Sequence, residues 1–142
     1  MDHVSFCGNF NKEHSVTEPA GSDLLSIIEG KLMLVGVRII KKNMTDYSHY
    51  LIVDFDGVVF RLEVGYVSDK NSEWLLYFSL DRFYQRLLWF FYINKCNSFA
   101  SLIHKILREC QEIYEIRWYK NKKNWNFNSE EFEREPTKGD AH

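Results

Sequence analysis

The chain has 142 residues, of which 45% are hydrophobic and 27% charged, and its formal net charge at pH 7 is −2. These values are typical of a single globular domain, and they argue against a disordered chain and against a nucleic-acid binder that is basic throughout. Aromatic residues are unusually frequent at 16%. Such a content predicts a core filled with rings, some exposed rings at an interface, or both.

The N-terminal segment shows no secretion signal, because no basic region is followed by an apolar stretch. No window approaches the ~20 apolar residues that a membrane helix requires. The three cysteines (Cys7, Cys96 and Cys110) are odd in number and far apart, which fits reduced thiols better than a disulfide framework. We therefore expect a soluble cytoplasmic protein.

The first predicted elements are short. Residues 4–10 alternate weakly and are expected to form a short edge strand. A helix is expected to begin at an N-cap of Ser22 or Asp23 and to end at Gly30. Residues 32–40 alternate apolar and other positions, which predicts a strand, and a polar loop follows at 41–48.

Residues 49–64 carry the clearest local signal in the chain, that of a β-hairpin. Asp56 and Gly57 separate two apolar runs, and an Asp-Gly pair supplies both positive-φ positions of a type I′ turn. A two-residue loop also fixes the pairing register, so that Val53 faces Phe60. The predicted apolar face consists of Leu51, Val53, Phe55, Val58, Phe60 and Leu62. The other face, expected to meet water or a partner, consists of Tyr50, Ile52, Asp54, Val59, Arg61 and Glu63.

Residues 68–73 form a turn cluster, and residues 74–80 are expected to form another strand with Trp74, Leu76 and Phe78 on one face. Four successive strands with short polar links predict an antiparallel meander with one solvated side. Residues 81–93 are ambiguous. They fit a helix that Asp81 caps, but their aromatic content also fits a strand.

A second, amphipathic helix is expected to begin at an N-cap of Asn97 or Ser98. Its apolar stripe consists of Phe99, Leu102, Ile103, Ile106, Leu107, Cys110 and Ile113. The stripe needs an apolar surface to cover, and the apolar face of the hairpin provides one. Residues 114–119 either extend this helix or form a last strand.

The predicted architecture is an α+β domain over residues 1–128. An antiparallel sheet of four or more strands carries C-terminal helical structure on one of its faces. Residues 129–142 are polar apart from one ring and are expected to form a flexible tail.

The sequence contains no motif that indicates catalysis, a metal or a cofactor. The histidines are scattered, no Cys-x-x-Cys is present, and neither a Gly-x-Ser-x-Gly motif nor a phosphate-binding glycine loop occurs.

Cys110 lies on an apolar stripe, where a thiol behaves as a small hydrophobe. His104 is expected to be an exposed residue on the polar face of its helix. Asp54 and Asp56 could form a carboxylate pair, but Asp56 already has a role in the turn. We therefore expect a protein that performs no chemistry.

Charge is distributed unevenly along the chain. Residues 43–81 contain seven acidic and two basic residues, a net charge of −5, whereas residues 82–123 contain nine basic and three acidic residues, a net charge of +6. Such asymmetry steers charged partners. It leads to two hypotheses about binding.

The first hypothesis is that acidic residues around an aromatic anchor bind a basic protein, because carboxylates steer the encounter and a buried ring supplies a hot spot. The candidate residues are Asp46, Tyr50, Asp54, Glu63, Asp69 and Glu73. As a small, aromatic-rich, single-domain protein without motifs, the chain resembles bacterial toxin-immunity proteins of contact-dependent inhibition systems. The resemblance implies stoichiometric neutralisation of a toxin, such as a basic nuclease, without catalysis. It implies no roles for particular residues.

The second hypothesis is that the basic and aromatic part of residues 82–123 and its neighbour Trp125 bind single-stranded nucleic acid, because basic side chains hold phosphates and rings stack on bases. The candidate residues are Arg82, Arg86, Arg117, Trp118, Lys120, Lys122, Lys123 and Trp125. The element order also resembles half of a single-stranded-DNA-binding whirly fold. The overall pI of about 6.2 argues against such a binder.

Overall fold

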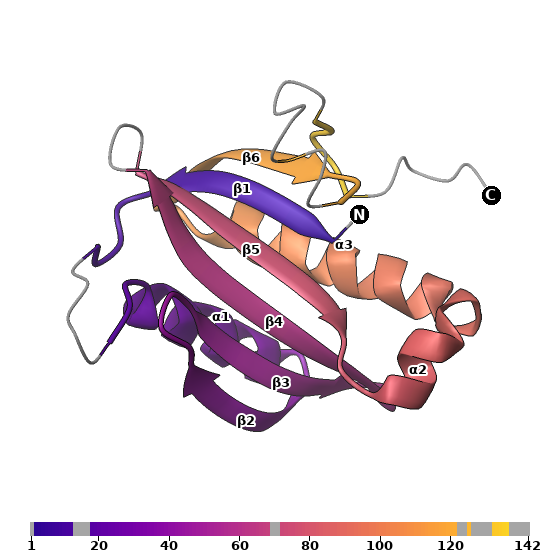
Figure 1. The fold of residues 1–142 in the computed structure, drawn as a ribbon. Coiled ribbons are helices and arrows are strands. Elements are labelled where there is room, and N and C mark those ends of the chain that lie inside the picture. Colours follow the sequence, from indigo (N-terminus) through magenta and orange to yellow (C-terminus); the bar gives the residue numbers. More distant parts are fainter. Residues whose placement is uncertain (1, 13–17, 69–71, 122–124, 126–131, 137–142) are drawn as a thin grey trace.

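The protein is an antiparallel sheet of six strands in the order β2-β3-β4-β5-β1-β6, seen in a computed structural model (Figure 1). The structure describes residues 2–12, 18–68, 72–121, 125 and 132–136. The strands are β1 (His3–Gly8), β2 (Arg38–Met44), β3 (His49–Phe55), β4 (Val58–Ser68), β5 (Glu73–Leu80) and β6 (Ile113–Tyr119). The helical elements are α1 (Ser22–Leu34), α2 (Phe83–Leu87), the short 3-10 helix η1 (Trp89–Phe91) and α3 (Ile93–Glu109).

The predicted α+β class is confirmed. Strands β2 to β5 form an antiparallel meander, and α1 and the C-terminal helix α3 lie together on one side of the sheet (Figure 1). No described helix covers the opposite face of the sheet. The two faces of the strands therefore have different environments, one in the core and one outside it.

The predicted hairpin is confirmed in both its turn and its register. Asp56 and Gly57 have φ values of 50° and 85°, the two positive values that a type I′ turn needs. Val53 pairs with Phe60, as the two-residue loop requires. The apolar face of the hairpin lies in the core, where Leu51, Val53, Phe60 and Leu62 are fully buried.

The core is centred on α3, whose apolar stripe packs on the hairpin as predicted. The ring of Phe99 stacks on that of Phe60 at a centroid distance of 4.3 Å and meets the edge of Phe78 at 5.1 Å. The helix begins at Ile93, before the predicted N-cap at Asn97 or Ser98, and Tyr92 occupies the N-cap position. Of the predicted stripe, Phe99, Ile103, Ile106, Leu107, Cys110 and Ile113 are buried. The helix ends at Glu109, however, so that Cys110 is its C-cap and Ile113 begins β6.

The predicted strand at 32–40 is wrong in its first part. Helix α1 continues through Gly30 to Leu34, because Leu32 extends the helical spacing of Leu24 and Ile28 and is fully buried with them. The chain turns only at Gly36, whose φ is +85°. Strand β2 therefore starts at Arg38 and extends into the predicted polar loop.

The strand predicted at residues 4–10 is present as β1, but its predicted position at an edge of the sheet is wrong. Strand β1 lies inside the sheet, where it pairs with β5 on one side and β6 on the other. Its partners come from later in the chain, so local alternation gave no sign of its position. The buried side chains of Val4 and Phe6 are consistent with this interior place.

Residues 81–93 form neither one helix nor a strand. The Asp81 amide still donates to the Val59 carbonyl at 2.9 Å, so Asp81 continues the sheet and does not cap a helix. Two short helical elements, α2 and η1, then follow before α3 begins.

Residues 114–119 belong to β6, so that of the two alternatives left by the sequence, an extended helix or a last strand, the strand is correct. Part of the predicted tail lies against this strand, because Glu133 and Trp118 exchange two backbone hydrogen bonds of 2.8 Å. Segments 129–131 and 137–142 of the predicted tail lie outside the described residues, and the predicted flexibility stays a prediction for them.

Candidate protein-binding surfaces

The acidic residues predicted to bind a partner do not form one exposed cluster. Asp46 is exposed in the β2–β3 turn, and Glu73 is partly exposed at the start of β5. Asp54 is half-buried, accepts the Gly57 amide at 2.8 Å and forms an ion pair of 2.9 Å with Arg38. Asp69 lies outside the described residues.

Tyr50 and Glu63 are buried, contrary to the expectation that they meet water. The Arg61 guanidinium lies 3.9 Å from the Tyr50 ring centroid and covers it, while its Nε atom lies 3.3 Å from the Glu63 carboxylate. Ser48 donates a further hydrogen bond of 3.0 Å to Glu63. The neighbouring long side chains, and not a helix, remove this ring and this carboxylate from water.

Glu63 is held in its charged form. Burial would raise the pKa of Glu63, but hydrogen bonds from Tyr77, Arg61 and Ser48 outweigh it and lower the pKa. Burial and the Glu63 carboxylate raise the pKa of Tyr77, so this hydroxyl stays protonated as a donor. The His3 ring stacks on Tyr77 at 5.4 Å. We call this set, on the side of the sheet without helices, the charged sheet face; its members are His3, Tyr50, Asp54, Arg61, Glu63 and Tyr77.

The residues of the nucleic-acid hypothesis are divided between two parts of the fold. Trp118 is fully buried, so its ring has no free face on which a base could stack. Arg117 on β6 lies 3.7 Å from Glu115 and covers the Phe132 ring at 4.8 Å. Arg82 and Arg86 are exposed near α2, and Lys120 is exposed after β6. Trp125 is half-buried, and Lys122 and Lys123 lie outside the described residues.

The largest group of exposed apolar side chains lies on α2, η1 and the start of α3. Their exposed fractions run from 42% for Leu88 to 71% for Phe91. We call this group the aromatic surface; it consists of Phe83, Tyr84, Leu87, Leu88, Trp89, Phe90, Phe91 and Ile93. In a single helix over residues 81–93, one of the two alternatives that the sequence allows, Phe83, Leu87, Phe90 and Phe91 would share one side. The missed signal is that the segment has more large apolar residues than one face of a short helix can bury.

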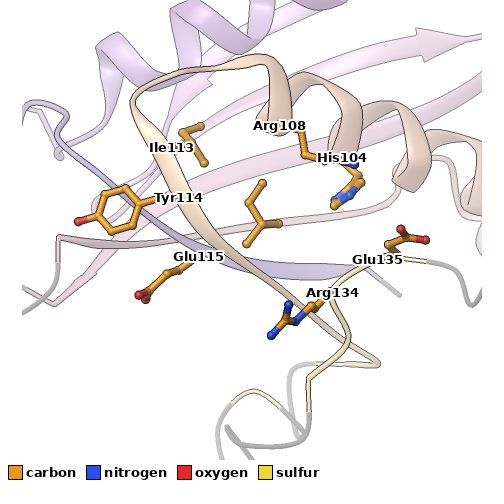
Figure 2. A pocket seen from close by; sticks show the side chains of 8 residues that line it. His104, Arg108, Ile113, Tyr114, Glu115, Arg134 and Glu135 are labelled. Atoms are coloured by element: carbon orange, nitrogen blue, oxygen red, sulfur yellow. The ribbon is translucent and has the colours of Figure 1, made fainter.

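A shallow hollow of about 350 Å³ lies between α3, β6 and the segment at 132–136 (Figure 2). Arg108 and His104 line it from α3, Arg134 and Glu135 from the opposite wall, and Glu115 from β6. Glu115 has a φ of +54° at an irregularity in the β1–β6 pairing, a position where a β-bulge turns a side chain aside. The walls of the hollow carry both positive and negative side chains. The hollow therefore favours neither an anionic nor a cationic ligand.

No family model, curated protein or solved structure matches this chain. A function for this chain therefore has to be inferred from the geometry of its candidate surfaces.

His104 is half-buried and hydrogen-bonded, whereas the sequence predicts an exposed residue on the polar face of its helix. Its Nδ1 atom accepts a hydrogen bond of 3.0 Å from the Trp118 indole, which assigns the ring proton to Nε2. Burial, and then the nearby Arg108 guanidinium, lower the pKa of His104. The ring is therefore neutral at pH 7 and serves as a fixed acceptor for a buried tryptophan.

The cysteines are free thiols, and burial is the main cause that raises the pKa of Cys7, Cys96 and Cys110. They are consequently poor nucleophiles at neutral pH. Within the described part of the chain, no group of three or more His, Cys, Asp or Glu side chains could hold a metal ion. None of the described helices is long and apolar enough to cross a membrane.

Proposed function

We propose that this protein is a non-catalytic binding module, and specifically an immunity protein that neutralises a toxin by binding to it stoichiometrically. The observation that carries the proposal is the charged sheet face. There, Tyr50, Arg61, Glu63 and Tyr77 interlock on a side of the sheet that no described helix covers. Tyrosine and arginine are the residue types that dominate binding energy at protein interfaces.

The rigidity of this array favours binding. Arg61 is held between a ring and a carboxylate, so its rotamer is largely fixed before a partner arrives. Ordering a free arginine at an interface costs roughly 0.5–1.5 kcal/mol, and a preorganised side chain avoids most of that cost. A flat, rigid face that blocks the active surface of a toxin needs no chemistry of its own.

A basic partner fits the carboxylates at the border of this face. Asp46 and Glu73 are accessible, and neither forms an ion pair with another described residue. Glu63 is unsuitable as a contact because it is buried beneath Arg61. In this proposal, Glu63 positions Arg61, while the accessible carboxylates meet the partner.

The test is affinity capture from a lysate of the native host, with and without nuclease treatment. We expect a protein to be captured in stoichiometric amount in both samples, and purified toxin domain to lose its activity when one equivalent of this chain is added. The double variant Asp46→Lys with Glu73→Lys should weaken the binding by at least about tenfold, since charge reversal repels a basic partner.

A matched control is Glu109→Lys with Glu112→Lys, which makes the same change in net charge at exposed positions near the end of α3, on the other side of the sheet. This control should bind as the unmodified chain does. Equal binding by both double variants, each shown to be folded by circular dichroism, would rule out the carboxylates at the border of the charged sheet face as contacts of the partner. Capture that disappears with nuclease would favour nucleic acid through exposed residues such as Arg82 and Arg86.

A further inference from the structure

The aromatic surface lies apart from the charged sheet face, at the end of the sheet where β3 turns into β4. Figure 1 places α2 beside that turn, and Gln85 of α2 joins the two. The Gln85 carboxamide accepts the Val59 amide at 3.2 Å and donates to the Gly57 carbonyl at 3.3 Å. The buried Gln85 thus fixes α2 to the sheet, while its neighbours Phe83, Tyr84 and Leu87 point to solvent.

The exposed apolar area is the size of one half of an interface. Each ring has about 200 Å² of accessible surface, so the five rings, all more than half exposed, offer roughly 600 Å². The three aliphatic side chains, Leu87, Leu88 and Ile93, raise this towards the ~800 Å² that each partner contributes to an interface of standard size. Within this surface the Phe90 ring neighbours those of Trp89 and Phe91, at centroid distances of 6.4 and 4.5 Å. The surface of a monomer seldom exposes an apolar patch of this size.

The edge of this surface carries both signs of charge. Asp81 directly precedes Arg82, and Arg86 follows within α2. On the neighbouring turn, Asp56 forms an ion pair of 3.2 Å with Lys95. An apolar centre with acidic and basic groups around it is complementary to a copy of itself, because a two-fold axis turns the basic side chains of one copy towards the acidic side chains of the other.

We propose that two copies of this chain associate through the aromatic surface of each and form a symmetric homodimer. Symmetric dimers are the commonest soluble assemblies, and their interfaces are more apolar than those of transient complexes. The proposal does not depend on the toxin-binding function, because the charged sheet face stays free in such a dimer.

A lipid surface fits these residues less well. Membrane-binding clusters combine about 4–8 basic residues without acidic ones. Here the segment contains three cations, Arg82, Arg86 and Lys95, and Lys95 forms an ion pair with Asp56. The net charge of −2 for the whole chain adds repulsion from an anionic bilayer.

The experiment is sedimentation velocity of the purified full chain from about 1 μM to about 100 μM, a range in which a dimer of ordinary strength forms. We expect a monomer–dimer equilibrium that shifts to dimer as concentration rises. Quenching of tryptophan fluorescence by acrylamide should fall over the same range, because Trp89 is more than half exposed whereas Trp74 and Trp118 are fully buried.

The test variant is Leu87→Ser with Phe91→Ser, which removes two exposed side chains and no core contact. It should weaken dimerisation by at least about a hundredfold, since two buried apolar anchors are lost. The matched control is Tyr47→Ser with Tyr114→Ser, which removes two exposed rings elsewhere. This control should dimerise as the unmodified chain does.

Three results would overturn the proposal. The first is a chain that stays monomeric at every concentration. The second is a dimer that survives in the folded Leu87→Ser/Phe91→Ser variant. The third is co-flotation of a monomeric chain with vesicles of phosphatidylcholine and phosphatidylserine, which would assign the aromatic surface to a membrane.

Discussion

The hydrogen bond between His104 and Trp118 joins a titratable ring to the core. The Trp118 indole is fully buried and donates to His104 Nδ1 at 3.0 Å. If Nδ1 takes up a proton, it can no longer accept that bond, and the indole loses its partner. A buried donor without a partner costs about 1–3 kcal/mol.

This bond predicts how stability depends on pH. Burial and Arg108 lower the pKa of His104 in the folded state. Above the unfolded-state pKa of about 6.5, neither state binds the proton and the full stability is present. As the pH falls below that value, the unfolded state takes up the proton first, so stability is lost down to the lower folded-state pKa. Urea unfolding at about pH 7.5 and about pH 5.5 should show this loss.

The control for this prediction is His104→Gln, whose carboxamide oxygen offers an acceptor that does not titrate. It should remove part of the pH dependence between the two conditions while leaving the fold intact. An identical pH dependence in the variant and the unmodified chain would show that other groups cause it.

At the scale of elements, the packing of α3 on the hairpin depends on one ring. Phe99 is fully buried and meets Phe55, Phe60 and Phe78 at centroid distances between 4.3 and 5.5 Å. Such a ring contacts the hairpin and β5 simultaneously. It therefore couples the longest described helix to the centre of the meander.

Replacing this ring should destabilise the whole domain. We expect Phe99→Ala to lower the free energy of unfolding by about 3–5 kcal/mol, because it removes buried area and leaves a cavity. Phe99→Leu should cost less, since it fills part of the space. Denaturant unfolding followed by circular dichroism measures both changes. A loss below about 1 kcal/mol for the alanine variant would mean that the core collapses onto the gap.

The elements that the sequence predicts well are those whose signals are local. Asp56 and Gly57 determine both the turn and the register of the hairpin, and the spacing from Phe99 onward identifies α3. Gly30 is a weak signal for a helix end, because a helix tolerates an interior glycine when the residues around it are buried. The surface positions were harder to predict. The burial of Tyr50 depends on where the long Arg61 side chain lies, which alternation along a strand does not encode.

At the scale of the molecule, β1 connects the two halves of the sheet. It pairs with β5 through Val4 and Leu76 and with β6 through Val4 and Trp118. Without β1, the meander and β6 have no strand between them. We therefore expect deletion of residues 2–8 to abolish cooperative unfolding, measured by circular dichroism and by amide exchange.

A peptide complementation assay sharpens this test. A synthetic peptide of residues 2–8, added in excess, should restore part of the native signal, because it can insert between the same two strands. A scrambled peptide of the same composition should not. A deletion variant that unfolds cooperatively by itself would show that the sheet closes without its inserted strand.

The interior position of β1 also has a consequence for synthesis. This strand leaves the ribosome before both of its neighbours, which are made much later, β5 at residues 73–80 and β6 at residues 113–119. Contacts between such distant parts of a chain form slowly, because a long loop must close first. The nascent chain thus carries β1 without its second partner until residues 113–119 have been made. Translation speed and chaperones that bind nascent chains should therefore influence the yield of this protein more strongly than they influence proteins in which each strand pairs with the next one in the chain.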